Sequence, residues 1–224
     1  EVIILDDAYQ HRSLRPGYSI LLIDYQRPIN KDHLLPAGSL REPAANRNRA
    51  HIILVTRSPE RMKPIEMREY VNRLGLDIGQ HLFFTNIRYE ELVPVFGDEP
   101  VKSENWFKDQ DTGVIIVTGI ANPRGIRQYA RGIQPRFSEM SFPDHHRYTS
   151  KDLEKVQLKY QELKKKWNEV LVLTTEKDAV KFRELEPSTE LTSSMHAIRI
   201  GINFLNDDKD NFDKQIINYV TSNK

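Results

Sequence analysis

Glu1-Val2-Ile3-Ile4-Leu5-Asp6-Asp7-Ala8-Tyr9-Gln10-His11-Arg12 is a short apolar run that ends in two adjacent carboxylates, with Gln-His-Arg close behind. Val and Ile side by side favour a strand buried on both faces, as in a parallel sheet. Two acids at the carboxyl end of such a strand lie where the ligands of open α/β sheets bind. In nucleotide-hydrolysing and phosphate-transferring proteins, one acid at this position holds Mg²⁺. The segment therefore predicts an α/β fold that handles phosphate groups.

The loop that normally cradles the phosphates does not accompany this segment. The pattern G-x-x-x-x-G-K-[ST] occurs nowhere in the 224 residues. The stretch Gly119-Ile120-Ala121-Asn122-Pro123-Arg124-Gly125 has neither its spacing nor its lysine. The chain also begins without Met, inside the expected strand. We therefore expect it to be the later part of a longer protein whose phosphate-binding loop precedes Glu1.

Composition narrows the class of protein. A length of 224 residues allows one large or two small domains. The hydrophobic share of 38% and the charged share of 29% suit a globular protein with a sizeable core. A net charge of +1 produces no strong field toward nucleic acid, so no nucleic-acid partner is expected. The absence of cysteine excludes disulfides and thiolate metal sites.

Short apolar runs alternate with amphipathic stretches, which predicts an α/β protein with a mainly parallel sheet. The expected strands are Val2–Leu5, Ser19–Ile23, His51–Val55, His81–Phe84, Val114–Thr118, Val170–Thr174 and Ala197–Ile200. The expected helices are Glu60–Leu74, Pro123–Arg131, Ser150–Trp167, Lys177–Leu185 and Asn211–Val220. Pro64 is compatible only with the first turn of its helix. Thr149 or Ser150 can cap the clearest helix, whose apolar residues recur at spacings of three and four.

These elements suggest two lobes. Residues 1–58 would be the C-terminal part of an incomplete parallel-sheet lobe, and residues 59–80 a connecting segment. Residues 81–205 hold enough strands and helices for a second, smaller α/β lobe, and residues 206–224 would form a closing helix. The polar stretch Asp98–Asp111 is expected to be a loop.

The first candidate site follows the opening strand. Asp6 and Asp7 can coordinate Mg²⁺, or they can be a helix cap and a solvated acid. Gln10 and His11 follow, and if the chain turns into a helix here, His11 is within reach of the same crevice, where it can orient a phosphate or an acceptor hydroxyl. The alternative for His11 is a surface side chain beside Arg12.

A second candidate is Leu34-Leu35-Pro36-Ala37-Gly38-Ser39-Leu40-Arg41-Glu42-Pro43. Pro and Gly here indicate an irregular, pinned loop. Arg41 then suits planar, bidentate recognition of phosphate. The alternative is a rigid connector in which Arg41 and Glu42 form a structural pair.

The arrangement of these motifs resembles the tetraacyldisaccharide 4'-kinases, the lipid A 4'-kinases of Gram-negative bacteria. The resemblance rests on five motifs that follow one another in order over most of the chain. They are Leu5-Asp6-Asp7-x-x-Gln10-His11-Arg12, Leu35-Pro36-Ala37-Gly38-x-Leu40-Arg41-Glu42-Pro43, Thr118-Gly119-Ile120-Ala121-Asn122-Pro123, Phe142-Pro143-Asp144-His145-His146-x-Tyr148 and Thr174-Thr175-Glu176-Lys177-Asp178-Ala179-Val180. In one departure, Ala8 stands where the family usually has Gly.

The resemblance implies a P-loop-kinase-like core lobe, incomplete in this chain, joined to a smaller α/β lobe with the active site in the cleft between them. It implies transfer of the ATP γ-phosphate to the 4' hydroxyl of an acylated glucosamine disaccharide 1-phosphate, with Mg²⁺. The Walker A loop, an essential acidic residue and a membrane-associating helix would precede Glu1. The full protein would act at the cytoplasmic face of the inner membrane with no known protein partner, and residues 1–224 alone would be soluble and inactive.

The same resemblance suggests roles for individual residues. Asp6 and Asp7 would hold or orient Mg²⁺, and Arg41 would neutralise phosphate. His11 and His145 would orient the acceptor hydroxyl or phosphate oxygens. Two further residues, Gln10 and Lys177, would contact the nucleotide.

Four alternatives stay open. Asp144-His145-His146 matches the metal-binding triplet of the DHH phosphoesterases, which need further Asp-bearing motifs to complete a two-metal site. Thr175-Glu176-Lys177-Asp178 can simply cap and begin a helix. The chain can also belong to another P-loop enzyme with a soluble substrate, or to a non-catalytic module that binds nucleotide or a partner.

Overall fold

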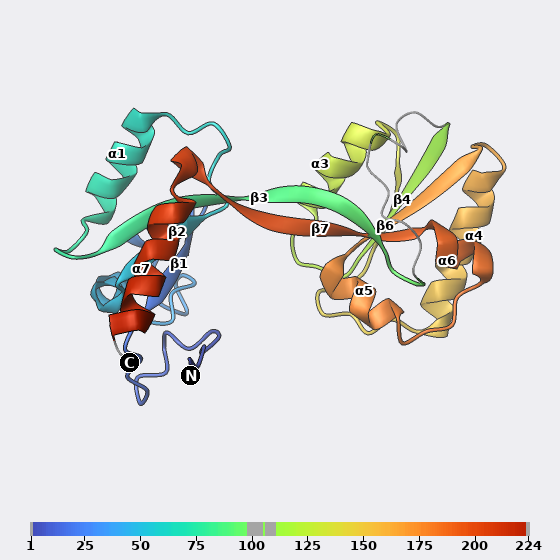
Figure 1. The fold of residues 1–224 in the computed structure, drawn as a ribbon. Helices are drawn as coiled ribbons and strands as arrows, with labels where there is room; N and C mark the ends of the chain where they lie inside the picture. The colour runs from blue at the N-terminus through green and yellow to red at the C-terminus, as the bar shows by residue number, and fades with distance from the viewer. Residues whose placement is uncertain (1, 98–104, 106–110, 223–224) are drawn as a thin grey trace. The chain divides into compact units, whose positions relative to one another are not determined.

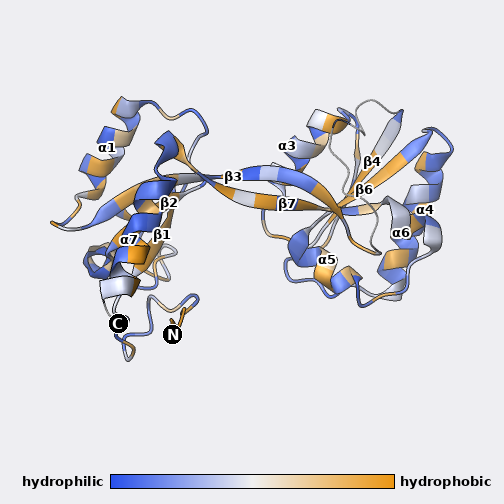
Figure 2. Cartoon of the chain, viewed as in Figure 1, coloured by the Kyte–Doolittle hydropathy of each residue, from blue (hydrophilic) through white to orange (hydrophobic). Residues whose placement is uncertain are grey.

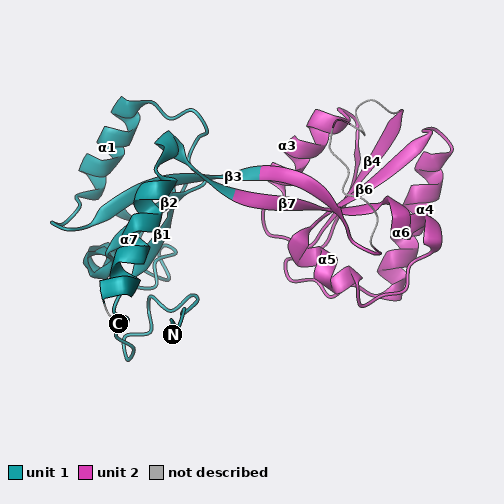
Figure 3. Cartoon of the chain, viewed as in Figure 1, with its two compact units in different colours: residues 1–88, 202–224 teal, residues 89–201 magenta. Residues whose placement is uncertain are grey.

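The computed structural model describes residues 2–97, 105 and 111–222, which divide into two compact units (Figures 1 and 3). Unit 1 contains residues 1–88 and 202–224, and unit 2 contains residues 89–201. The chain leaves unit 1 along strand β3 (His81–Pro94) and returns to it along strand β7 (Met195–Phe204). These bounds differ from the lobes suggested by the sequence, because both the expected connecting segment and the closing helix pack within unit 1.

Unit 1 is built on a parallel sheet. Strand β1 (Ile20–Asp24) pairs with β2 (Ile52–Thr56), and β2 pairs with the first part of β3. Helix α1 (Pro64–Leu74) contributes Tyr70 and Leu74 to the core that also contains Phe84. Phe83 points to the opposite face and meets Phe212 of helix α7 (Lys209–Ser222) edge-on. The two helices therefore cover opposite faces of the sheet.

Helix α1 begins and ends where its sequence dictates. Pro64 occupies the first turn, where its missing N–H costs nothing. The Lys63 N–H donates to Glu66 Oε2 at 2.7 Å. Gly75 closes the helix at φ +66°, a conformation that glycine adopts without strain. The expected start of this helix at Glu60 was therefore four residues early.

Unit 2 is a second parallel sheet, in which neighbouring strands follow the order β7-β6-β4-β5. Its elements are β4 (Thr112–Thr118), α3 (Arg124–Ile133), β5 (Ser138–Ser141), α4 (Ser150–Lys164), β6 (Glu169–Thr175), α5 (Glu176–Phe182) and α6 (Thr189–Ser194), together with the adjoining parts of β3 and β7.

Both faces of this sheet are buried. Ile115 and Val117 of β4 face a core that includes residues of α4, α5 and α6, whereas Val114 and Ile116 face the core under α3. Every residue of β4 is buried, and apolar colour runs along β4 and β6 in Figure 2. A strand that is covered on both faces has a continuous run of apolar residues. Such strands are therefore easy to recognise in the sequence.

One expected strand was wrong. Val2–Leu5 has no strand pairing, and its side chains are exposed, with Ile3 at 85% and Ile4 at 89%. A segment forms a β-strand only when its backbone hydrogen-bonds to a neighbouring strand. Within the described residues, no strand pairs with this segment. The other six expected strands are present, and the five expected helices form with shifted ends.

Strand β5 and helix α6 were not anticipated, because their sequences are largely polar and carry no apolar period. The expected loop Asp98–Asp111 lies almost entirely outside the described residues. Among the helices that the structure describes, none has the length and apolar character needed to cross a bilayer.

Candidate active site

In unit 1 the structure brings together the first two motifs. Arg41 Nη1 lies 3.5 Å from Asp7 Oδ2. The two side chains are 63% and 80% exposed, so water screens the pair and it contributes little to stability. The alternative reading of this loop, a structural pair between Arg41 and Glu42, is not what the described residues show, since Glu42 pairs with Arg49. Arg41 instead reaches across from its loop to the acid pair.

A small network holds the two motifs in place. Glu42 pairs with Arg49, and the Arg49 Nη2 donates to the Tyr9 carbonyl at 3.2 Å. The Arg49 guanidinium lies 4.6 Å from the centre of the Tyr9 ring. The Tyr9 hydroxyl donates to the carbonyl of Asn46 at 2.8 Å. Sequence patterns alone gave no role to Tyr9 or Arg49, because their partners lie about forty positions away.

The loop before Arg41 is pinned by one acid. Asp32 Oδ1 accepts from the His33 N–H at 2.7 Å and from the Ser39 N–H at 3.1 Å. A Cβ on Gly38 would lie 2.3 Å from the same Asp32 oxygen, so only glycine fits there. The expected rigid Pro-Ala-Gly loop is therefore present, and its anchor is Asp32.

The remaining candidates of this unit are open to solvent. The side chains of Asp6, Gln10 and His11 are all exposed. The backbone turns at this point, with the His11 N–H donating to the Ala8 carbonyl at 2.9 Å. Asp7 adopts φ +47°, an uncommon conformation that Asp tolerates better than most residues.

The donor set at Asp6 and Asp7 suits Mg²⁺. This ion keeps several waters and takes one or two carboxylates together with phosphate oxygens. Within the described part of the chain, no group of three or more His, Asp or Glu side chains is arranged to hold a metal by itself. That finding covers the Asp144-His145-His146 triplet as well, so the described residues give the phosphoesterase alternative no support.

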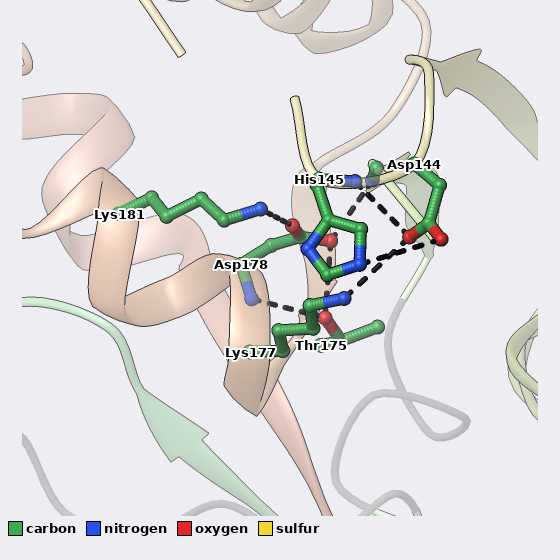
Figure 4. A network of polar contacts seen from close by, with 7 residues as sticks. Asp144, His145, Thr175, Lys177, Asp178 and Lys181 are labelled. Carbon is green, nitrogen blue, oxygen red and sulfur yellow. Dashed lines mark hydrogen bonds and ion pairs between the residues drawn. The ribbon is translucent and has the colours of Figure 1, made fainter. Parts of the chain in front are cut away.

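In unit 2 the other three motifs meet at the carboxyl ends of β4 and β6 (Figure 4). The Gly119 N–H donates to Asp178 Oδ2 at 2.9 Å, and the Gly119 carbonyl accepts from the His145 N–H at 3.2 Å. A Cβ on Gly119 would lie 3.2 Å from the Pro143 carbonyl oxygen, so the loops are in close contact. This is the sheet edge at which α/β proteins bind ligands.

His145 and Lys177 share one partner at this edge. Asp144 lies 3.7 Å from His145 Nε2 and 3.5 Å from Lys177 Nζ (Figure 4). Partial desolvation raises the pKa of Asp144, but the charges of His145 and Lys177 outweigh it and hold that pKa below its ordinary value. The His145 side chain is 76% exposed, which leaves its ring free to meet a ligand.

His146 points elsewhere. Its Nε2 lies 3.1 Å from Asp152 Oδ2, and its ring stacks on Phe142 with the ring centres 4.8 Å apart. Asp152 also accepts from the Thr149 N–H and hydroxyl, which closes a capping box at the start of α4. The geometry therefore gives His146 a structural role through its side chain.

Asp152 makes stability depend on pH. Burial raises the pKa of its carboxyl, but bonds from Thr149, His146 and Lys155 outweigh burial and hold that pKa well below its ordinary value. A folded pKa below the unfolded one, which is about 3.9, gives stability that is present at neutral pH and lost as pH falls. We expect the thermal midpoint difference between wild type and Asp152→Asn to narrow as pH falls from about 6 to 3. A pH-independent difference would contradict this assignment.

The sequence was compared with models of protein families and with curated proteins. The family model described as Tetraacyldisaccharide-1-P 4'-kinase matches residues 1–221. The tetraacyldisaccharide 4'-kinase of Bacteroides thetaiotaomicron is 37% identical over 230 residues, covering 100% of this chain and 60% of that protein. Its counterpart in Bacteroides fragilis strain NCTC 9343 is 38% identical over 228 residues, with the same two coverages. The chain thus spans about 60% of the length of these curated relatives.

Among solved structures, the crystal structure of the "apo" form of LpxK from Aquifex aeolicus in complex with ATP matches with a TM-score of 0.60. The sequence identity is 24%, and the match covers 96% of this chain and 56% of that one. At this identity the likeness establishes the α/β fold alone. The family match over residues 1–221 shows that the chain belongs to the tetraacyldisaccharide-1-P 4'-kinase family.

Proposed function

We propose that the protein containing this chain transfers the γ-phosphoryl group of ATP to the 4' hydroxyl of an acylated glucosamine disaccharide 1-phosphate, a step of lipid A biosynthesis. Family membership and the names of the relatives support this proposal. The acceptor carries acyl chains, so the reaction would take place at the cytoplasmic face of the inner membrane. A segment preceding residue 1 would reach that surface.

The observation that carries the proposal is the approach of Arg41 to Asp7. Phosphoryl transfer needs a carboxylate that holds the metal and a cation that neutralises the phosphate, both close to the transferred group. Arg41 Nη1 stands 3.5 Å from Asp7 Oδ2, although 34 positions separate the two residues in the sequence. The exposed pair costs little to break, so the guanidinium can exchange a carboxylate oxygen for a phosphate oxygen.

Each candidate residue then has a task. When bound, Mg²⁺ supplies charge neutralisation on the transferred phosphoryl group. Asp6 and Asp7 would hold it, and Arg41 would take a phosphate oxygen. His11 and His145 would orient the acceptor hydroxyl or phosphate oxygens, with the His145 ring beside Asp144 as seen in unit 2. Gln10 and Lys177 would contact the nucleotide.

The acceptor class can be tested directly. The full-length protein is incubated with Mg²⁺, γ-labelled ATP and either the acylated disaccharide 1-phosphate in detergent micelles or its deacylated, water-soluble form. We expect transfer to the acylated acceptor with kcat/KM at least about 10-fold higher, because the acyl chains supply apolar binding energy that the soluble form lacks. Preference for the deacylated sugar would instead indicate a soluble-substrate kinase.

A further inference from the structure

The Asp178 carboxylate is fully buried, although the roles proposed so far do not include it. Full burial is unusual for an Asp side chain. Its side chain is 0% exposed. Oδ1 accepts from Lys181 Nζ at 2.9 Å, and Oδ2 accepts from the Thr175 hydroxyl at 3.0 Å and from the Gly119 N–H at 2.9 Å. Capping of α5 explains the contact with Thr175. It does not explain why the carboxylate also bonds a peptide 59 positions away.

The Gly119 peptide links Asp178 to the histidine loop. Its N–H is held by Asp178, and the carbonyl of the same residue accepts from the His145 N–H at 3.2 Å. The preceding residue, Thr118, accepts from the Phe142 N–H at 2.8 Å through its carbonyl. The loop that carries His145 is therefore tied at two points to the end of β4, and Asp178 fixes that end from the other side.

The His145 backbone needs such support. It adopts φ +60°, a conformation that costs a non-glycine residue free energy and persists only where the surroundings impose it. Its N–H donates to the Gly119 carbonyl at 3.2 Å and to the Asp144 carboxylate at 3.0 Å. The position of the His145 backbone thus follows from where Gly119 is held.

We propose that Asp178 is a positioning residue of the phosphoryl-transfer site, which acts through the Gly119 peptide to set the backbone of His145. The inference rests on the proposed function of His145. Asp178 itself touches no substrate and contributes through the bond between its Oδ2 and the Gly119 N–H. The same carboxylate sets the first turn of α5, and so fixes Lys177 beside Asp144.

Three substitutions separate this role from helix capping and from charge. Asp178→Asn keeps an oxygen that can accept from the Gly119 N–H. Lys181 loses its carboxylate partner, but its side chain is 25% exposed and can turn to solvent. Asp178→Glu keeps the charge and the capping ability of a third-position acid, but its extra methylene in a fully buried site must displace Gly119. Asp178→Ala removes the bond altogether. If Asp178 positions Gly119, Asp178→Asn should lower activity less than Asp178→Glu. If Asp178 only caps α5 or supplies charge, Asp178→Glu should lower activity less than Asp178→Asn.

The test uses the full-length protein and follows kinase turnover. We expect Asp178→Asn to keep kcat within about threefold of wild type, because one amide acceptor replaces one carboxylate acceptor. Asp178→Glu and Asp178→Ala should lower kcat by about 10²-fold with KM for ATP nearly unchanged, as for a displaced catalytic group. Asp152→Ala is the matched control for Asp178→Ala, since it removes the acid of the equivalent Thr-Asp-Lys cap of α4 without touching Gly119. It should lower thermal stability and leave kcat within about threefold.

Hydrogen exchange of the peptide spanning residues 142–147 gives a readout that does not require turnover. Its protection should fall about 10-fold or more in Asp178→Glu and stay near wild type in Asp178→Asn. If Asp178→Ala fails to fold, the Asn and Glu pair still decides. A wild-type kcat in Asp178→Glu together with a lowered kcat in Asp178→Asn would overturn the inference. A wild-type kcat in all three variants would overturn it as well. An inactive wild-type enzyme counts against the proposed function, while the exchange result still tests the link to His145.

Discussion

Asp7→Asn in the full-length protein is expected to lower kcat for ATP-dependent phosphorylation by about 10³-fold while the protein remains folded. The substitution removes the negative charge that would hold Mg²⁺ and keeps the shape of the side chain. Stability should change by less than about 0.5 kcal/mol, because the Asp7 side chain is 80% exposed and its pair with Arg41 is open to water. The measurement is turnover against Mg²⁺ concentration, together with a thermal melt.

A matched control distinguishes metal binding from a loss of surface charge. Asp77→Asn removes an exposed acid of the same unit, in the turn after α1. Its turnover should stay within about twofold of wild type, as for a surface substitution away from a site. If Asp7→Asn turns over at the wild-type rate across the Mg²⁺ titration, Asp7 is not the metal ligand.

His145→Gln is the second substitution with a large expected effect. We expect kcat to fall by about 10²-fold, the usual scale for losing a side chain that orients or transfers a proton. The His145 ring is 76% exposed and lies beside Asp144, so glutamine should leave the fold intact. Turnover and thermal midpoint are measured on the same preparation.

The neighbouring histidine is the control for this substitution. His146→Gln loses the contact between its ring and Asp152 at 3.1 Å and the stack on Phe142. It should lower the thermal midpoint and keep kcat within about threefold, because its ring belongs to the cap of α4. A large loss of kcat in His146→Gln with normal turnover in His145→Gln would reverse the two assignments.

The strands covered on both faces were the most predictable part of this fold. In β4 and β6, successive buried residues leave a continuous apolar run in the sequence. The run Val2–Leu5 has the same character, yet it is exposed and unpaired among the described residues. Local composition shows that a segment favours a strand, but the hydrogen-bond partner that makes it one is a property of the rest of the fold.

The motifs in the sequence single out the residues of the candidate site, but they do not predict which side chains those residues contact. Asp7, Arg41, His145 and Lys177 stood out from motifs and from the family resemblance. The contacts between Arg41 and Asp7 and between Lys177 and Asp144 depend on loop paths that no local pattern encodes. Asp178 shows this most clearly. As the third residue of a helix it looked like an ordinary first-turn acid, but its carboxylate is buried against Gly119.

The position of the transferred phosphate tests the central claim most directly. The full-length enzyme is supplied with ATP, Mg²⁺ and the acylated disaccharide 1-phosphate, and the product is analysed by phosphorus–proton correlation NMR. The account predicts one new phosphate monoester coupled to the proton at the 4' carbon, formed by wild type and not by Asp7→Asn. Phosphate at any other hydroxyl, or equal product from Asp7→Asn, would contradict it.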